Sequence, residues 1–436
     1  MHMRTTTLVI LATAAVTVGL AVPALATSGG AASTTVAGAP GSGQSVVDWN
    51  RELISILGTP NAQPATVHPT RGFAMLQAAE YDAVVSITKA APPYGSAVPA
   101  PDGARPDAAA DQAAHDVLVA LYPGMRAGLD ARLNGQLAGI PDGKPEQDGV
   151  AVGAAAARQI VALRASDGAA ATAAPFTPGT APGDYRPTPP KFAAPMYTGW
   201  GSVTPFLLTS PQQFQPAAPP PVSSREYATA LAEVRDLGRD TSMSRTPDQT
   251  VAGKFWSASP IWNTWNQITQ QLVTDRHADL AQATAVFSAL DLSLADTTIG
   301  LYDAKYTDHV WRPVTAVQQG ATAGNPGITG DPTWNPLTPT ATDPSYPGAH
   351  SALSEAAATV LTAFYGPRQA VTVTSAADPG VRRRFANLAD AAQEAGLSRI
   401  WSGQHTRIDH EAGQQLGHQV AEVALSALQV HLVDAG

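Results

Sequence analysis

Two histidines and three cationic side chains fall in three short blocks of the C-terminal third of the chain: Lys305 with Arg312, then His350, then Arg399 with His405. Lysine and arginine bind oxyanions through charge-assisted hydrogen bonds. Histidine can bond the central atom of an oxyanion or transfer a proton. The set therefore indicates an oxyanion site, in which three cations hold equatorial oxygens, one imidazole bonds the central atom and the other moves a proton.

Each block taken alone also has a purely structural explanation. Lys305 can be a solvated residue at a helix end, and His350 can be a turn residue before a helix that Ser351 caps. His405 and Asp409 stand four residues apart, so on a helix they would share one face, as two surface residues also would. Only the order and spacing of all three blocks favour a single site.

The first 26 residues have the pattern of a secretory signal peptide. Arg4 gives a positive start, residues 8–22 are an unbroken run of small and apolar residues, and Ala24-Leu25-Ala26 is a typical cleavage site. We therefore expect a signal peptide over 1–26, a flexible segment over 27–45 and a secreted protein. The alternative is an uncleaved N-terminal anchor. No later run is long and apolar enough to span a bilayer, so we expect no stable membrane anchor.

Composition limits the classes of partner. The chain has no cysteine, so an exported protein of this sequence must be stabilised by a buried core rather than by disulfides. Its formal net charge is −9, which argues against nucleic acid as a partner. A local group of cations can still bind a small anion within a weakly acidic surface. The composition leaves the oligomeric state open.

Apolar residues recur at three- and four-residue spacing through most of the chain, and alanine is abundant, so we predict an all-α fold. We expect one helical domain over 46–436. It divides into an N-terminal bundle (46–166), a proline-rich crossover (167–224) and a C-terminal catalytic bundle (225–436). The crossover contains aromatic residues, which favours an ordered segment on the surface. Among the later helices we expect 277–290, 291–302 and 381–396, with loops over the site between 312 and 350.

The three blocks resemble a known signature. The pattern Lys305-x6-Arg312-Pro313, then Pro347-x-x-His350, then Ser398-Arg399-x5-His405-x3-Asp409 is similar to the one shared by vanadium-dependent haloperoxidases and the type 2 phosphatidic acid phosphatase superfamily, which includes bacterial non-specific acid phosphatases. The likeness is strongest over 296–417. The flanking segments look like those of the secreted bacterial haloperoxidase branch. The resemblance implies two packed four-helix bundles with the active site in the second.

The resemblance also implies a role for each residue. His405 would bond the vanadium or phosphorus axially, and Asp409, one helical turn along, would orient its imidazole. The equatorial oxygens would be held by three cations: Lys305, Arg312 and Arg399. His350 would be the acid–base group at the opposite apical position.

The middle block departs from the family pattern, which usually reads Pro-Ser-Gly-His. Here Gly348 replaces the serine, so one hydroxyl donor to the anion is missing. Ala349 can still offer a backbone N–H at the start of a helix, where the dipole favours an anion. Losing one neutral hydrogen bond costs about 0.5–1.5 kcal/mol. We therefore expect Gly348, Ala349 and His350 to remain part of an anion site.

Three functions follow from the resemblance. The first is a vanadate-dependent haloperoxidase that uses hydrogen peroxide to oxidise a halide to a hypohalous acid equivalent, which attacks a small organic acceptor. The second is a secreted acid phosphatase that hydrolyses phosphate monoesters through a phosphohistidine on His405. The third is an inactive oxyanion-binding scaffold. Asp343 stands where halide-oxidising relatives tend to have an aromatic residue or histidine, and an acid there would repel halide.

Overall fold

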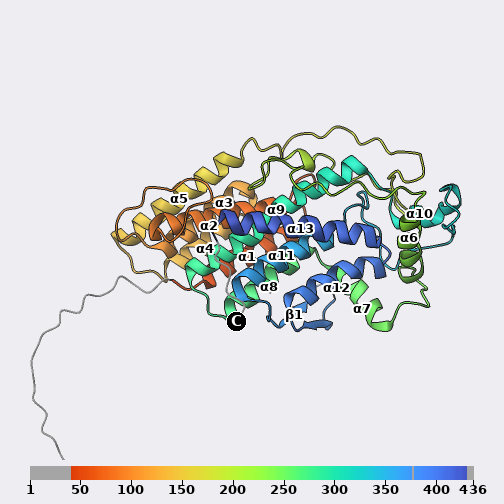
Figure 1. Cartoon of the computed structure of the whole chain (residues 1–436). Coiled ribbons are helices and arrows are strands. Elements are labelled where there is room, and N and C mark those ends of the chain that lie inside the picture. Colours follow the sequence, from red (N-terminus) through yellow and green to blue (C-terminus); the bar gives the residue numbers. More distant parts are fainter. Residues whose placement is uncertain (1–40, 376–377, 430–436) are drawn as a thin grey trace, which may run out of the picture. The chain divides into compact units, whose positions relative to one another are not determined.

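The computed structural model describes residues 41–375 and 378–429, which lie in one compact unit. Within these residues α-helices are the dominant regular structure and the strands are two short ones (Figure 1), which confirms the predicted all-α helical-bundle class. The α-helices are α1 (Gln44–Gly58), α2 (Thr70–Thr88), α3 (Pro106–Leu121), α4 (Arg126–Leu137), α5 (Lys144–Arg164), α6 (Arg225–Leu237), α7 (Pro247–Ala258), α8 (Ile261–Asp275), α9 (Leu280–Asp308), α10 (Pro313–Gln318), α11 (Ala349–Tyr365), α12 (Leu388–Trp401) and α13 (Arg407–Ala427). Short 3-10 turns lie at Pro123–Met125, Trp200–Ser202 and Gly320–Thr322, and a hairpin joins β1 (Val371–Thr374) to β2 (Arg382–Phe385).

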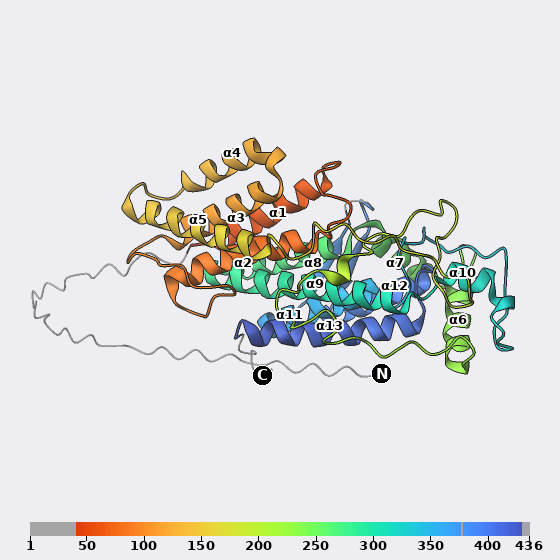
Figure 2. The ribbon, with the colours of Figure 1, turned by 90° about the horizontal axis from the view of Figure 1, so that it is seen from above.

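Helix α9 is the central element. It packs against α2 from the N-terminal half and against α11 and α13 from the C-terminal half, as Figure 2 shows. Two helices were predicted here, yet the structure has a single one of 29 residues. It begins at a capping box between Asp279 and Gln282 and ends at His309, whose φ of 35° is left-handed. No proline interrupts the segment between these signals, so the helix continues.

Helices α11 and α13 approach each other very closely. A Cβ added at Gly417 would lie 2.0 Å from the carbonyl oxygen of Ala352, and one at Gly413 would lie 2.5 Å from that of Gly348. Both distances are far below van der Waals contact, so only glycine allows this approach. The close packing fixes the N-terminal ends of α11 and α13 relative to each other.

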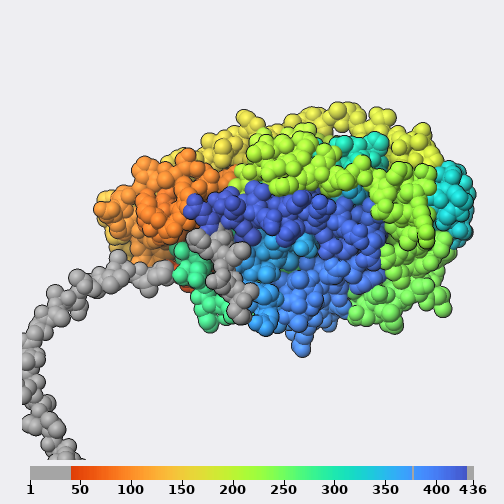
Figure 3. All heavy atoms as spheres, viewed as in Figure 1, coloured from red at the N-terminus to blue at the C-terminus, as the bar shows by residue number. Residues whose placement is uncertain are grey.

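The segment 167–224 contains no α-helix and lies against the helical core. Figure 3 shows its yellow and lime atoms beside α13 along one face. The aromatic residues Trp200 and Phe206 are buried. Asp296 of α9 accepts hydrogen bonds from the backbone amides of three successive crossover residues: Phe206 at 2.6 Å, Leu207 at 2.7 Å and Leu208 at 2.9 Å. The backbone of Met196 also donates to Thr342 at 2.9 Å, so the crossover is tied to the loop before α11.

The helix predicted over 381–396 is wrong at its start. Residues 382–385 form β2, which pairs antiparallel with β1, and α12 begins only after Asn387, whose side chain caps it. The alternating Val-Thr-Val-Thr sequence of β1 favours a strand, and its partner strand follows from that pairing. Arg383 of β2 makes ion pairs with Asp248 of α7 and Glu394 of α12, which hold the hairpin against both helices.

No helix within residues 41–375 and 378–429 is long and apolar enough to cross a membrane. The signal peptide expected over 1–26, and most of the segment expected over 27–45, lie outside the described residues. The division at 166 and 224 stays a prediction. The main apolar core continues from α1 and α2 through α9 to α13.

Candidate active site

The predicted site residues lie at helix ends that meet on the side of the molecule carrying α6 and α10 (Figure 2). Lys305 lies in the last turn of α9, and Arg312 lies at the start of α10. His350 lies in the first turn of α11, and Arg399 lies in the last turn of α12. His405 lies in the turn before α13, and Asp409 lies in the first turn of α13. All of them except His350 are more than 90 % buried.

His405 is held between an acid and a cation. Its Nδ1 lies 3.5 Å from Asp409 Oδ2, and its Nε2 lies 3.3 Å from Arg312 Nη1. The same Asp409 oxygen accepts from the Thr406 amide at 2.7 Å and from Ser345 Oγ at 2.8 Å. The Thr406–Asp409 capping box that begins α13 therefore also fixes the carboxylate beside the imidazole. Burial, followed by the charge of Arg312, lowers the pKa of His405 to about 3, so the imidazole is neutral.

Lys305 and Arg312 both face Asp343. Lys305 Nζ lies 3.3 Å from Asp343 Oδ2, and it also donates to the backbone oxygens of Pro344 and Ser345. Arg312 donates from Nε to the Asp343 carbonyl at 2.7 Å and from Nη2 to its carboxylate. Burial lowers the pKa of Lys305 to about 8, although Asp343 opposes the shift.

Arg399 contributes a buried donor without an acceptor. Its Nη1 donates to Ser257 Oγ of α7, but its Nε is buried and has no hydrogen-bond partner in the structure. An orphaned buried guanidinium N–H is costly unless an acceptor is bound there. Burial, followed by the nearby Arg312 charge, lowers the pKa of Arg399 to about 9. Both causes disfavour the charged guanidinium, and a bound anion would offset them.

His350 lies at the start of α11, where backbone amides have no partner within the helix. Its Nε2 is 3.0 Å from the carbonyl oxygen of Trp256, which fixes the ring and favours a proton on that nitrogen. Burial, followed by the charge of Arg399, lowers the pKa of His350 well below its usual range. No side chain caps the helix, so the first-turn amides near Ala349 can face an anion.

Gly348 has an ordinary extended backbone, with φ −79° and ψ 116°. An added Cβ would nevertheless lie 3.0 Å from the carbonyl oxygen of Asp409, to which the Gly348 amide already donates at 2.8 Å. The glycine thus permits close contact between the loop before α11 and the first turn of α13. A serine at this position would need a small shift of that first turn.

Reasoning from the sequence missed three contributors to the site. The Ser345 hydroxyl donates a hydrogen bond to Asp409, and the Ser257 hydroxyl accepts one from Arg399. The Trp256 carbonyl oxygen lies within hydrogen-bond distance of His350. Ser257 and Trp256 come from α7, far from the three blocks, and no local pattern marks them. Ser345 lies two residues before Pro347, so the middle block could have been extended to include it.

The donor set suits an oxyanion rather than a bare metal ion. Within the described residues no group of three or more histidine, cysteine, aspartate or glutamate side chains could hold a metal. The site instead offers two guanidinium groups, one ammonium group, the first turn of α11 and one imidazole. A vanadate or phosphate ion would fit these donors, and the unpaired Arg399 Nε is the clearest sign of it.

Residues 285–434, about a third of the chain, match the family model described as the VCPO second helical-bundle domain. This match agrees with the resemblance to the vanadium haloperoxidase superfamily that the three sequence blocks indicated. A search of curated proteins found no match.

Solved structures share the fold over most of the chain. The structure of the first bacterial vanadium-dependent iodoperoxidase matches with a TM-score of 0.75 and 24 % sequence identity, covering 90 % of this chain and 98 % of that one. A holo-type bacterial vanadium-dependent chloroperoxidase matches with a TM-score of 0.66 and 15 % identity, covering 85 % and 94 %. The apo-type structure gives 0.64 and 14 %, covering 84 % and 95 %. At these identities the likeness establishes the fold.

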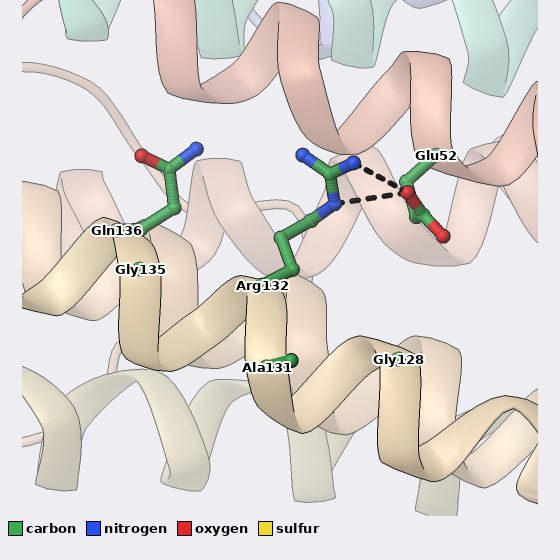
Figure 4. A pocket seen from close by; sticks show the side chains of 6 residues that line it. All are labelled: Glu52, Gly128, Ala131, Arg132, Gly135 and Gln136. Atoms are coloured by element: carbon green, nitrogen blue, oxygen red, sulfur yellow. Dashed lines mark hydrogen bonds and ion pairs between the residues drawn. The ribbon is translucent and has the colours of Figure 1, made fainter.

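A hollow of about 490 Å³ lies on the N-terminal half, apart from the predicted site residues. Figure 4 shows the side chains that line it, from α1 and α4. Gly128, Ala131 and Gly135 of α4 line it, beside the ion pair of Arg132 with Glu52. Its lining has no buried donor without an acceptor. Anion binding is therefore better assigned to the cage, the group formed by Lys305, Arg312, Arg399 and His405, in which Arg399 Nε is such a donor.

Proposed function

We propose that this protein is a vanadate-dependent haloperoxidase that oxidises halide with hydrogen peroxide. The observation that carries the proposal is the buried, unpaired Nε of Arg399 in a site that also holds Lys305, Arg312 and the oriented imidazole of His405. The shared fold with bacterial iodo- and chloroperoxidases supports the haloperoxidase over other oxyanion enzymes.

In this proposal the chain's own residues have separate tasks. Lys305, Arg312 and Arg399 would hold the oxygens of a bound oxyanion and offset their charge. His405 would offer its unprotonated Nε2 as a ligand, because Asp409 faces the Nδ1 side of the ring. Bound vanadate would supply the activation of hydrogen peroxide toward a nucleophile.

His350 would move the proton that the reaction requires. Its ring is neutral and held through Nε2 by the Trp256 carbonyl, so Nδ1 is left as the acceptor. A neutral imidazole can take a proton from incoming hydrogen peroxide and return it to the departing oxygen. The product would be a hypohalous acid equivalent that reacts with a small organic acceptor outside the cage.

The experiment is halide-dependent oxidation of a phenol dye by the purified protein, with hydrogen peroxide, before and after addition of vanadate. We expect oxidation that requires both vanadate and iodide or bromide. His405→Ala should abolish it, whereas His418→Ala, on the half-exposed face of α13, should leave it unchanged. Oxidation that is equal with and without vanadate would contradict the proposal.

A phosphatase is the second candidate, and Asp343 is the observation that favours it. A carboxylate beside Lys305 and Arg312 would repel a halide ion that enters the site. It would also repel a phosphate monoester, but the several oxygens of the ester could replace the carboxylate as acceptors for Lys305 and Arg312. Hydrolysis of a phosphate ester in vanadate-free buffer, lost in His405→Ala, would replace the haloperoxidase by this second function. Secretion from the cell is part of both proposals and is tested by finding the protein in the culture medium without residues 1–26.

A further inference from the structure

The cage contains a negative charge of its own. The side chain of Asp343 is 9 % exposed, and its two carboxylate oxygens face two different cations. One oxygen lies 3.3 Å from Lys305 Nζ, and the other accepts from Arg312 Nη2. Although burial alone would raise its pKa, Lys305 and Arg312 lower the pKa of Asp343 to about 2, so the group is ionised. The carboxylate thus bridges two of the three cations that would hold an oxyanion.

This bridge uses donors that an external anion would need. An ammonium group has three N–H donors, and those of Lys305 face Pro344 O, Ser345 O and Asp343 Oδ2. On Arg312, Nε and Nη2 both bond Asp343, and Nη1 bonds the Gln404 carbonyl at 3.0 Å. All three donors of Lys305, and each of the three nitrogens of Arg312, therefore already contact an acceptor.

Arg399 differs from the other two cations. Within the described residues no carboxylate forms an ion pair with it, and its Nε has no acceptor. An incoming oxyanion would consequently find one cation without a carboxylate partner and two that share the single negative charge of Asp343. With Asp343 and Asp409 both ionised, three cations face two carboxylates, so the formal charge of the group falls from +2 without Asp343 to +1 with it.

We propose that Asp343 is an internal counter-anion that competes with the oxyanion for Lys305 and Arg312 and so sets the affinity of the cage. The inference rests on the proposed function, because it presupposes that the cage binds an oxyanion. When the cage is empty, the carboxylate stabilises two buried cations. When an oxyanion enters, it must displace that carboxylate or bind beside it against electrostatic repulsion. An anion with several oxygens could replace both contacts of the carboxylate, whereas a single halide ion could not, so Asp343 is a specificity residue that favours oxyanions over halide.

The test is calorimetric titration of the wild type and Asp343→Asn with inorganic phosphate and, separately, with orthovanadate. We expect Asp343→Asn to bind both anions about 10- to 100-fold more tightly, since one negative charge is removed a few ångströms from the ligand. The matched control is Asp303→Asn, which removes the same charge two residues before Lys305. Asp303 bonds Gln212 rather than the cage, so affinity should stay within twofold.

Thermal unfolding gives a second measurement. Without phosphate, Asp343→Asn should unfold at a lower temperature than the wild type, because two buried cations lose their partner. Phosphate should then raise its midpoint by more than it raises that of the wild type, because ligand stabilisation grows with affinity. Asp343→Ser provides a second neutral variant. If neither variant folds even in phosphate, an oxyanion does not replace the carboxylate, and the inference is overturned.

Arg399→Ala distinguishes a failure of the proposed oxyanion cage from a failure of the inference about Asp343. Saturable binding to the wild type that is lost in Arg399→Ala supports the oxyanion cage. If Asp343→Asn then binds phosphate and vanadate no more tightly than the wild type, Asp343 does not compete with the anion. The inference is then overturned, although the proposed oxyanion cage is still supported. If none of the variants binds phosphate or vanadate, the proposed function itself fails, and the inference fails with it.

Discussion

Asp409 Oδ2 lies 3.5 Å from His405 Nδ1 and is itself held by two donors, the Thr406 amide and the Ser345 hydroxyl. The carboxylate therefore cannot rotate away without losing both hydrogen bonds. It keeps the proton of the neutral ring on Nδ1, which leaves Nε2 as the free nitrogen on the side of Arg312. The capping of α13 and the orientation of the candidate ligand thus depend on one side chain.

Replacing this acid should weaken anion binding without unfolding the protein. We expect Asp409→Asn to bind vanadate about 10- to 100-fold more weakly, the usual loss when the partner of a metal-bound histidine is removed. Calorimetry with vanadate measures the loss. Ser345→Ala, which removes only one donor to the carboxylate, should lose less. An affinity of Asp409→Asn within twofold of the wild type would show that Asp409 serves only to cap the helix.

His405→Ala should abolish vanadate binding and leave the helical content unchanged. His405 lies in the turn between α12 and α13, so truncation removes no helical residue. Circular dichroism checks the fold, and a vanadate titration checks the site. His418→Ala on α13 is the control, because that side chain is half exposed and pairs only with Glu422 and Thr359. Retained affinity in His405→Ala would remove His405 from the site.

Two substitutions of Gly348 separate the effect of a Cβ on thermal stability from the effect of a hydroxyl on vanadate affinity. Both Gly348→Ala and Gly348→Ser place a Cβ about 3.0 Å from the Asp409 carbonyl oxygen, so both should lower the thermal midpoint. If the family's hydroxyl donor can act here, Gly348→Ser should bind vanadate up to about fivefold more tightly than Gly348→Ala. An unchanged midpoint in Gly348→Ala would mean that the contact with α13 is readily relieved.

The buried His68 predicts a change of stability with pH. Its ring packs between Tyr197, at 4.9 Å between ring centroids, and Trp262, at 4.7 Å. Burial lowers its pKa to about 3, against the usual 6.5. Between pH 6.5 and 3 the unfolded chain binds a proton that the folded chain does not, so this residue's contribution to stability is lost as pH falls below 6.5.

The measurement is the free energy of unfolding of the wild type and His68→Gln from pH 7.5 to pH 5. Relative to the variant, the wild type should lose up to about 1.4 kcal/mol per pH unit once the pH is well below 6.5. Taking the difference cancels the opposing effect of the buried acids. A difference that does not vary with pH would show that His68 becomes protonated within the fold.

Much of this architecture could be predicted from the sequence, because helical periodicity and terminators are local signals. The three blocks likewise marked the residues at the helix ends that converge on His405. Interactions between distant segments were not predictable. The pairing of β1 with β2, the support of Arg399 by Ser257 and the position of Asp343 between Lys305 and Arg312 depend on tertiary packing. Asp343 was expected to repel halide, and its ion pairs with the cage appeared only in the structure.

The most direct test of the central claim is a calorimetric titration of orthovanadate into the wild-type protein, alone and in the presence of inorganic phosphate. One cage formed by Lys305, Arg312 and Arg399 around His405 would hold either tetrahedral anion. We therefore predict one vanadate site per chain, whose apparent affinity falls in proportion to added phosphate. Independent binding of the two anions, or no saturable binding of vanadate, would contradict the account.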